Sequence, residues 1–403
     1  MCGVRHSGIT VVGIPARNEA TTVASVARAA DEGLRQAFPN RTNVIVLADN
    51  GSTDGTADRF LDADLHAHQI VVRSTAAGTG KGTNVFAIAD KARELGADRV
   101  LLLDADVRST EPQWIERLAT AVDDDSPVLA LPTYRRNRFE ANTTNHLASP
   151  LLAAIFGVHV QQPIGGEFAF NAAFLERMTR WPRPASAYLY GIDIWLTANA
   201  LREHLRVAEV PLGRKVHNSP FPKILHLPQQ VLDSLFHVVS QLDRVRPAFR
   251  AAPVKREAVD GEFVRQDPDV IARVTTTTNH YLKAYQPDIQ RLLPSARILG
   301  PAPWGLWVGA DDWPHLLADA VEALADGCFE AARDHLVALY VNRVLTFWDE
   351  IDGLSGPEID ELLDRQAADT VRAVKYRSIT FDHQCNTGGF DAGLWAALDE
   401  HAA

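Results

Sequence analysis

The chain contains the stretch Arg99-Val-Leu-Leu-Leu-Asp-Ala-Asp106, an apolar run that ends in two carboxylates one residue apart. A short apolar run of this kind, bounded by polar residues, is typical of a buried strand. A second run, Ile9–Ile14, is rich in β-branched residues and is ended by Pro15, so it predicts another buried strand. Strands that are apolar on both faces belong to parallel sheets covered by helices.

Strand-like and helix-like segments alternate through the first half of the chain. Gly96 follows one helix-like segment at the place where a C-cap glycine belongs. The alternation predicts an α/β fold with a Rossmann-like, mostly parallel sheet and helices on both faces. The further strands are expected at 43–47, 69–73 and 128–132, and the helices at 19–36, 56–61, 83–95 and 111–122.

The second half has a different pattern. Residues 244–269 are rich in proline and charged residues and predict a linker. Beyond them, 270–293 and 313–374 have the apolar spacing of amphipathic helices. We therefore predict a catalytic α/β domain at 1–245 and a mainly helical domain at 246–403.

Composition excludes several classes of partner. The 403 residues include 40 Lys and Arg against 51 Asp and Glu, a net charge of −11, which disfavours nucleic acid and anionic membranes. The longest apolar run, 151–160, is too short to span a bilayer. Cys2, Cys328 and Cys385 are too far apart for a disulfide framework or a Cys-x-x-Cys site, so we expect a cytoplasmic protein.

Three polar motifs follow ends of the predicted strands: Asp49, Gly80-Lys81 and Asp104-Ala-Asp106. In a parallel sheet the ligand lies outside the carboxyl ends of the strands, so the three motifs are expected to converge at one edge. The Asp pair suits a divalent cation that bridges carboxylates to a diphosphate. The alternative is a pair of loop aspartates that cap the next helix.

Other motifs carry a functional and a structural interpretation side by side. Gly78-Thr-Gly-Lys-Gly82 suits phosphate binding or a plain turn, and it lacks the residues of a Walker A loop. Adjacent glycines beside a carboxylate in Gln162-Pro-Ile-Gly-Gly-Glu167 indicate close approach of the backbone to a ligand. Asp193 stands at a probable helix start, His217 follows a strand-like segment, and Arg135-Arg136 are either solvated or an anion clamp.

Taken in order, these motifs resemble the nucleotide-sugar glycosyltransferases of the GT-A fold, of the family-2-like kind. The match consists of Pro15-Ala-Arg-Asn-Glu19, Asp49-Asn-Gly-Ser-Thr-Asp54, Lys81-Gly82 and Asp104-Ala-Asp106. The later motifs, including Tyr190-Gly-Ile-Asp193, are similar to those of the retaining mannosylglycerate synthases and glucosyl-3-phosphoglycerate synthases. The resemblance covers about residues 9–240.

The resemblance implies a role for each matching residue. The nucleotide sugar would be held by Pro15, Arg17, Glu19, Asp49, Gly51, Lys81, Gly82, Asp104 and Gly166. The metal, Mg²⁺ or Mn²⁺, would be held by Asp104, Asp106 and His217. The reaction would be served by Lys81 on the leaving diphosphate, Glu167 in the sugar pocket and Asp193 on the acceptor or a sugar hydroxyl.

The resemblance therefore implies a metal-dependent, retaining transfer of a hexose from a nucleoside-diphosphate sugar to a small hydroxyl acceptor, a glycerate-like acid or related polyol. Where the phosphoglycerate enzymes have an arginine that grips the acceptor phosphate, this chain has Asn142-Thr-Thr144. An acceptor from a specialised-metabolite pathway, such as an aminoglycoside or nucleoside antibiotic precursor, therefore stays open. So do a sugar-1-phosphate nucleotidyltransferase, a non-catalytic GT-A binding module, and a homodimer built through the helical half.

Overall fold

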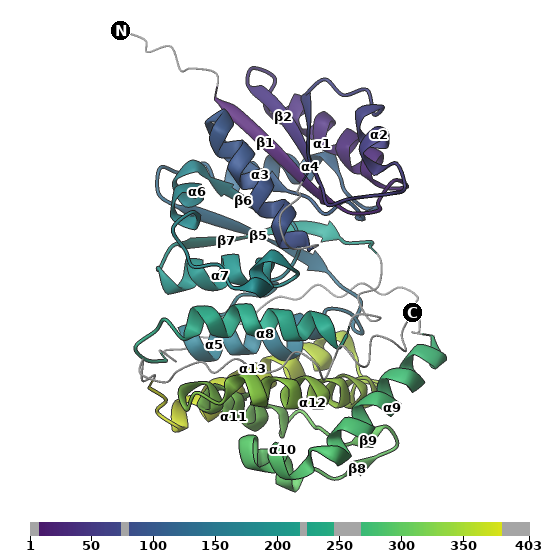
Figure 1. The fold of residues 1–403 in the computed structure, drawn as a ribbon, viewed down its shortest axis with the longest axis vertical. Coiled ribbons are helices and arrows are strands. Elements are labelled where there is room, and N and C mark those ends of the chain that lie inside the picture. Colours follow the sequence, from purple (N-terminus) through teal and green to yellow (C-terminus); the bar gives the residue numbers. More distant parts are fainter. Residues whose placement is uncertain (1–7, 74–79, 218–223, 246–266, 381–403) are drawn as a thin grey trace.

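The protein is described here by a computed structural model that covers residues 8–73, 80–217, 224–245 and 267–380. In these ranges one sheet of seven strands has the order β3-β2-β1-β4-β6-β5-β7, and all strands but β6 run parallel (Figure 1). The predicted Rossmann-like α/β fold is thus confirmed. Its strands are β1 (Ile9–Ala16), β2 (Thr42–Asp49), β3 (His68–Arg73), β4 (Ala97–Leu102), β5 (Val128–Arg135), β6 (Phe168–Asn171) and β7 (Arg206–Arg214).

Helices cover both faces of the sheet. The strands carry runs of consecutive apolar residues, so apolar side chains point to each face. Val11 faces the cluster built with α3 and α7, whereas Val12 faces the cluster built with α1 and α4. Gly13 lets α3 approach closely, since a Cβ there would lie 2.3 Å from Ile88. Gly96 ends α3 in the left-handed conformation, as predicted. The covering helices are α1 (Val23–Ala37), α2 (Thr56–Leu61), α3 (Lys81–Leu95), α4 (Pro112–Ala121), α6 (Ala172–Met178) and α7 (Ile192–Arg202).

The antiparallel strand β6 was not expected from the sequence. It has four residues, all buried, and it pairs with β4 and β5, which it separates in the sheet. Four residues are too few to show a strand period, so only the pairing with β4 and β5 defines this element.

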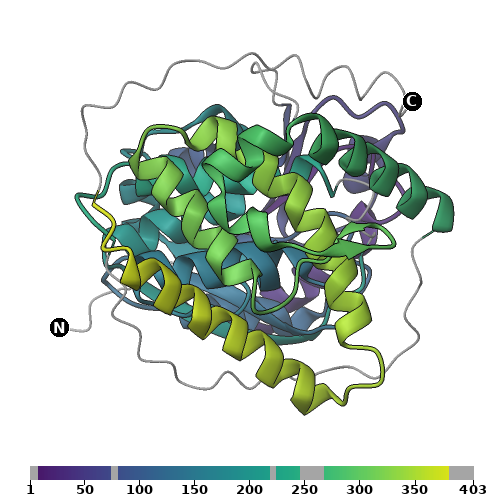
Figure 2. The same ribbon diagram turned by 90° about the horizontal axis from the view of Figure 1, so that it is seen from below.

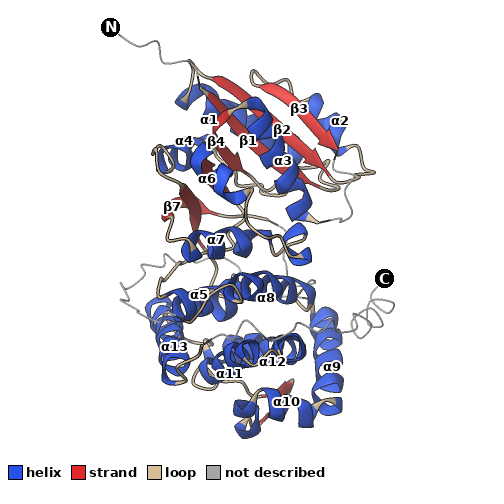
Figure 3. Ribbon diagram, turned by 60° about the vertical axis from the view of Figure 1, so that its left-hand side comes forward, coloured by secondary structure: helices blue, strands red, loops and turns tan. Residues whose placement is uncertain are grey.

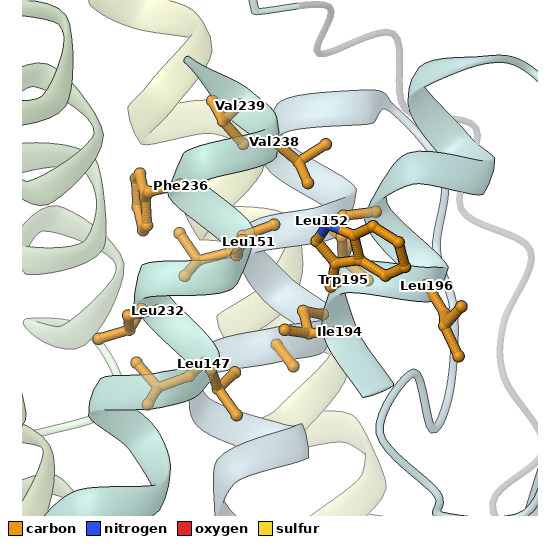
Figure 4. Packing of buried hydrophobic residues seen from close by; sticks show 14 of the residues in the cluster. Leu147, Leu151, Leu152, Ile194, Trp195, Leu196, Leu232, Phe236, Val238 and Val239 are labelled. Carbon is orange, nitrogen blue, oxygen red and sulfur yellow. The ribbon is translucent and has the colours of Figure 1, made fainter. Parts of the chain in front are cut away.

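A layer of helices joins the sheet to the helical half (Figure 1). It contains the π-helical turn η1 (Thr144–Ala148), α5 (Ser149–Phe156) and α8 (His226–Val239). Figure 4 shows Leu151 of α5 and Leu232 and Phe236 of α8 in a cluster that also includes Trp195 of α7. The apolar run at 151–160 is therefore largely a buried helix of the core, and in the described ranges no helix is long and apolar enough to cross a membrane.

The helical half packs under this layer, as Figures 2 and 3 show. Helix α13 contacts α5, and α12 contacts α8, so one hydrophobic cluster runs from the sheet into the helical half. The predicted linker lies mostly outside the described residues, and the boundary at residue 245 stays a prediction. The helices are α9 (Pro268–Ala284), α10 (Gln286–Leu292), α11 (Trp313–Ala325), α12 (Phe329–Glu350) and α13 (Gly356–Tyr376), with the small hairpin β8 (Pro301–Ala302) and β9 (Gly305–Leu306).

Candidate active site

The motifs singled out in the sequence meet at the carboxyl edge of the sheet. Lys81, at the start of α3, lies 2.8 Å from Oδ1 of Asp104, just beyond β4. The side-chain amide of Asn50, just beyond β2, donates to the carbonyl of Gly80. The convergence of the three polar motifs, expected from the topology, is present in the structure.

The centre of the site is a group of side chains that we call the ionic cluster. Nζ of Lys81 also lies 3.1 Å from Oδ1 of Asp193. Asp193 lies in the first turn of α7, which confirms its predicted position at a helix start. Nζ of Lys215 lies 3.2 Å from Oδ2 of Asp104 and 2.7 Å from Oε2 of Glu167. Each oxygen of Asp104 therefore faces one ammonium group. The ionic cluster consists of Lys81, Lys215, Asp104, Glu167 and Asp193.

Lys215 is the member of the ionic cluster that the sequence did not predict. Its side chain is 4% exposed and donates to the carbonyl of Gly165 as well as to the two carboxylates. Tyr134, near the end of β5, donates to Oε2 of Glu167, the same oxygen that accepts from Lys215. Lys215 stands two residues before His217 and directly after β7, and this position at a strand end was the available signal.

The three carboxylates of the ionic cluster differ in the direction of their pKa shifts. Burial raises the pKa of Asp104, but Lys81 and Lys215 together lower it well below its usual value. Burial dominates at Glu167 and Asp193, so the pKa of each is raised despite its lysine partner. The pKa of Lys81 is raised, because its carboxylate partners outweigh the effect of burial. Asp104 and Lys81 therefore form a charged pair at the centre of the site.

Glycines allow this close packing. Gly166 has φ +98°, and a Cβ there would lie 2.1 Å from Oδ2 of Asp104. The backbone at Gly166 does approach another group closely, but that group is Asp104, so the predicted approach to a ligand stays a prediction. Gly80 and Gly82 let the start of α3 pack closely against neighbouring backbone. A Cβ at Gly82 would lie 1.8 Å from the carbonyl oxygen of Ala187.

The predicted nucleoside side is built from two loops that bond to each other. The amide of Asn18 donates to Ser52, and the amide of Glu19 donates to Thr56. Asp49 accepts from the hydroxyl and amide of Ser52, which shapes the turn after β2. Pro15 was expected to end the first strand, but it pairs with Ala48 and β1 continues to Ala16. Arg17 and Glu19 follow β1, and Gly51 has φ +68° in the second loop. These residues lie together, and their role in nucleoside binding stays a prediction.

The loops that carry Asp106 and His217 also lie side by side. The amide of Arg108 donates to the carbonyl of Val216 at 2.9 Å, and the amide of Val216 donates to Ser109. Nη1 of Arg136 lies 3.1 Å from Nε2 of His217, so this nitrogen accepts from the guanidinium.

Among the described residues, no three His, Cys, Asp or Glu side chains are placed to hold a metal together. Asp104 has its two oxygens on two lysines, which makes it a poor ligand in this arrangement. A carboxylate and an imidazole on adjoining loops, Asp106 and His217, are donor types suited to Mn²⁺ or Mg²⁺ when phosphate oxygens complete the shell, although Arg136 occupies Nε2 of His217 in this arrangement. The residues present therefore fit a cation that is held jointly by protein and donor. The assignment of all three residues as ligands stays a prediction.

The segment expected near the acceptor directs its side chains into the protein. The side-chain amide of Asn142 donates to the carbonyl of Phe139, and Oγ1 of Thr143 lies 3.1 Å from the hydroxyl of Tyr340. Thr144 is buried. Arg136 is the charged side chain of this region that reaches the site, through His217 and Gln162.

Comparison with known proteins places this geometry in a class. Residues 11–179 match the sequence model of the family described as Glycosyl transferase family 2. The resemblance to nucleotide-sugar glycosyltransferases of the GT-A fold is thereby confirmed over these residues, and the prediction of a glycosyltransferase is supported with it. No curated protein sequence matches the chain.

Solved structures resemble the chain at low overall similarity. Glucosyl-3-phosphoglycerate synthase from Mycobacterium tuberculosis, in complex with phosphoglyceric acid, is 26% identical with a TM-score of 0.47, over 59% of this chain and 81% of that chain. The same enzyme in complex with Mn²⁺ and UDP-glucose is 26% identical with a TM-score of 0.48, over 59% and 80%. With TM-scores below 0.5, these likenesses support no conclusion about substrate.

Proposed function

We propose that the protein is a metal-dependent glycosyltransferase that moves a hexose from a nucleoside-diphosphate sugar to a small hydroxyl acceptor. The observation that carries the proposal is the placement of Lys81 between Asp104 and Asp193 at the carboxyl edge of the sheet. A cation held on carboxylates at that edge is positioned to neutralise charge that develops on a leaving diphosphate.

The remaining residues divide into two sides. The bonded loops after β1 and β2 take the nucleoside. Asp106 and His217 would hold a divalent cation, which would supply further charge stabilisation to the diphosphate. Lys215 keeps Asp104 and Glu167 in place. When the donor binds, Lys81 turns from Asp104 toward the diphosphate, and Asp104 keeps Lys215 as its counter-ion.

We infer a retaining outcome and an acidic or polyhydroxyl acceptor. Glu167 is fully buried and bonded to Lys215 and Tyr134, so it is not free to attack the sugar. Asp193 is held by Lys81. Transfer without a protein nucleophile, in which the acceptor attacks on the face that the diphosphate leaves, agrees with this arrangement. The guanidinium of Arg136 would pair with the carboxylate of an acidic acceptor.

The test is thermal stabilisation by a panel of nucleoside diphosphates and their sugars, with and without Mn²⁺. A ligand that binds only the folded protein raises the midpoint of unfolding. We expect a metal-dependent shift with one nucleotide, and its loss in Asp106→Ala and His217→Ala. Asp123→Ala, at an exposed salt bridge to Arg99, is the matched control and should keep the shift.

Transfer is then assayed with the stabilising donor and a panel of acids, polyols and amino sugars. Full activity after thorough chelation would contradict a metal-dependent transferase. Pyrophosphate release from a nucleoside triphosphate and a sugar phosphate would indicate a nucleotidyltransferase instead. Tight nucleotide binding with no turnover of any donor would indicate a binding module.

A further inference from the structure

The loop between β5 and η1, residues 136–143, begins inside the site and ends on the helical half. We call it the β5–η1 loop. At its start, Arg136 contacts Nε2 of His217 at 3.1 Å and Oε1 of Gln162 at 3.3 Å. Its position relative to the site therefore sets the position of this guanidinium.

The helical half holds the far part of the loop by three contacts. Nη1 of Arg138 donates to the carbonyl of Leu354 at 2.9 Å. Phe139 packs on a small hydrophobic cluster that includes Phe347 at the end of α12. The hydroxyl of Tyr340, in α12, lies 3.1 Å from Oγ1 of Thr143. Contacts with α12 and the turn that follows it thus reach the loop at its middle and its end.

The residues just after the loop are held in the same way. Nε2 of Gln366, in α13, donates to the carbonyl of Asn145 at 3.2 Å. Nε1 of Trp313, in α11, donates to the carbonyl of His146 at 2.5 Å. Both carbonyls lie within the π-helical turn η1, and such turns are often found at functional sites.

The loop also needs external support. Ala141 has φ +57°, a conformation that a residue with a Cβ adopts at a cost. Such conformations persist where surrounding contacts hold them. Within the loop, the side chain of Asn142 bonds to Phe139, and the contacts from the helical half stabilise the resulting shape.

We propose that the helical half positions the acceptor side of the site, with Tyr340 as a positioning residue that acts through Thr143 and the β5–η1 loop. This inference rests on the proposed function. The nucleoside side lies at β1 and β2, whereas the loop leaves β5, across β4 and β6 from them. A shift of the loop therefore moves Arg136, the cation proposed for the acceptor, and leaves the nucleoside loops after β1 and β2 in place. Through its contact with His217, Arg136 also reaches the metal side of the site.

The test compares Tyr340→Phe with Tyr281→Phe in the full-length protein. Both variants lose one buried tyrosine hydroxyl in the helical half, because the hydroxyl of Tyr281 lies 2.8 Å from Nδ1 of His335. We expect Tyr340→Phe to raise KM for the acceptor about threefold to tenfold, the effect of one lost hydrogen bond. KM for the donor should rise by a smaller factor than KM for the acceptor, because Arg136 also contacts His217, and Tyr281→Phe should leave both KM values and kcat unchanged.

A second variant identifies the path. Thr143→Val removes the other partner of the bond, so it should give the same rise in acceptor KM, and the double variant should add nothing further. Equal acceptor KM values in Tyr340→Phe and the parent protein would overturn the inference and leave the transferase proposal intact. If the parent protein turned over no donor, the proposed function and the inference about its acceptor would both fall.

Discussion

The ionic cluster at the sheet edge and the charges around Arg343 in the helical half use similar groups in different surroundings. In the ionic cluster, the side chains of Asp104, Lys81 and Asp193 are 21%, 14% and 11% exposed. The Arg343 side chain is fully buried and bonds to Glu350, Gln366 and the carbonyl of Val308. We call Arg343, Glu350, Gln366 and His146 the Arg343 cluster.

The comparison teaches that access and position decide the role of a buried charge. A lysine that lies at a strand end and keeps some exposure can exchange a carboxylate for a ligand. Arg343 has no such access, so its bonds fix how α12 and α13 dock on η1. We therefore expect changes in the Arg343 cluster to affect stability first, and changes in the ionic cluster to affect activity first.

The largest effect is expected for Arg343→Met. It leaves Glu350 partly buried without its counter-ion and leaves Gln366 without its guanidinium partner, so unfolding free energy should fall by about 3–5 kcal/mol. Urea denaturation measures this. Arg372→Met, at an exposed pair with Asp369 on α13, is the control and should lower it by less than about 1 kcal/mol. Equal losses would mean that the Arg343 cluster does not specify the docking.

Next is Lys81→Met in the ionic cluster. Transfer should lose about 10²–10³-fold in kcat, as when one group that stabilises transition-state charge is removed. The fold should persist, because Asp104 keeps Lys215. Lys91→Met, on the outer part of the same helix, should keep its activity. A loss of stability without a loss of rate would reverse the contrast between the two clusters.

Gly166→Ala separates backbone strain from the clash with Asp104. Gly166 and Gly96 both have positive φ, but a Cβ at Gly96 meets nothing within 4 Å. Gly96→Ala should therefore cost about 1 kcal/mol of stability and leave nucleotide binding unchanged. Gly166→Ala should cost about 1–3 kcal/mol and also weaken nucleotide binding. Unfolding midpoints with and without nucleotide measure stability and nucleotide binding. Equal changes in Gly166→Ala and Gly96→Ala would rule out an effect of the clash with Asp104.

The smallest effect is a dependence of stability on pH from His146. Burial, and then the charge of Arg343, lower the pKa of His146 well below its usual 6.5. The folded protein keeps His146 neutral while the unfolded chain takes up a proton, so stability is lost as pH falls below about 6.5.

His146→Gln should remove this part of the acid sensitivity. Between pH 7 and pH 5 the parent protein should lose about 1–2 kcal/mol more unfolding free energy than the variant, since one group contributes at most about 1.4 kcal/mol per pH unit. Urea denaturation at the two pH values gives the difference. Parallel losses in both proteins would show that His146 is not the group responsible.

Most of the α/β half could be predicted because its strands and helices have clear periods. Helix α2 was predicted with the bounds that the structure gives, and α3 ends at Leu95 with Gly96 as its C-cap, as expected. The antiparallel β6 was missed, since four apolar residues have no period of their own. The helical half was predicted as helical, but its buried polar pairs, such as Tyr340 with Thr143, join residues 197 positions apart.

The candidate site divides in the same way. The motifs at Asp104, Lys81 and Asp193 were found because polar residues follow strands or begin helices, and topology brings such positions to one edge. Lys215 was missed because its sequence neighbours do not show that it is buried. Its carboxylate partners, Asp104 and Glu167, lie on other segments, 111 and 48 residues away.

By itself, the sequence determined the strands and helices of about residues 9–135, the family resemblance and most of the polar residues at the strand ends. These depend on local periodicity and on the chemistry of neighbouring residues. Only the tertiary structure decided that Lys215 pairs with Asp104, that Gly166 makes room for that carboxylate, and that the helical half holds the β5–η1 loop. Such contacts depend on burial and on distances between remote segments, which are defined only when the chain is folded.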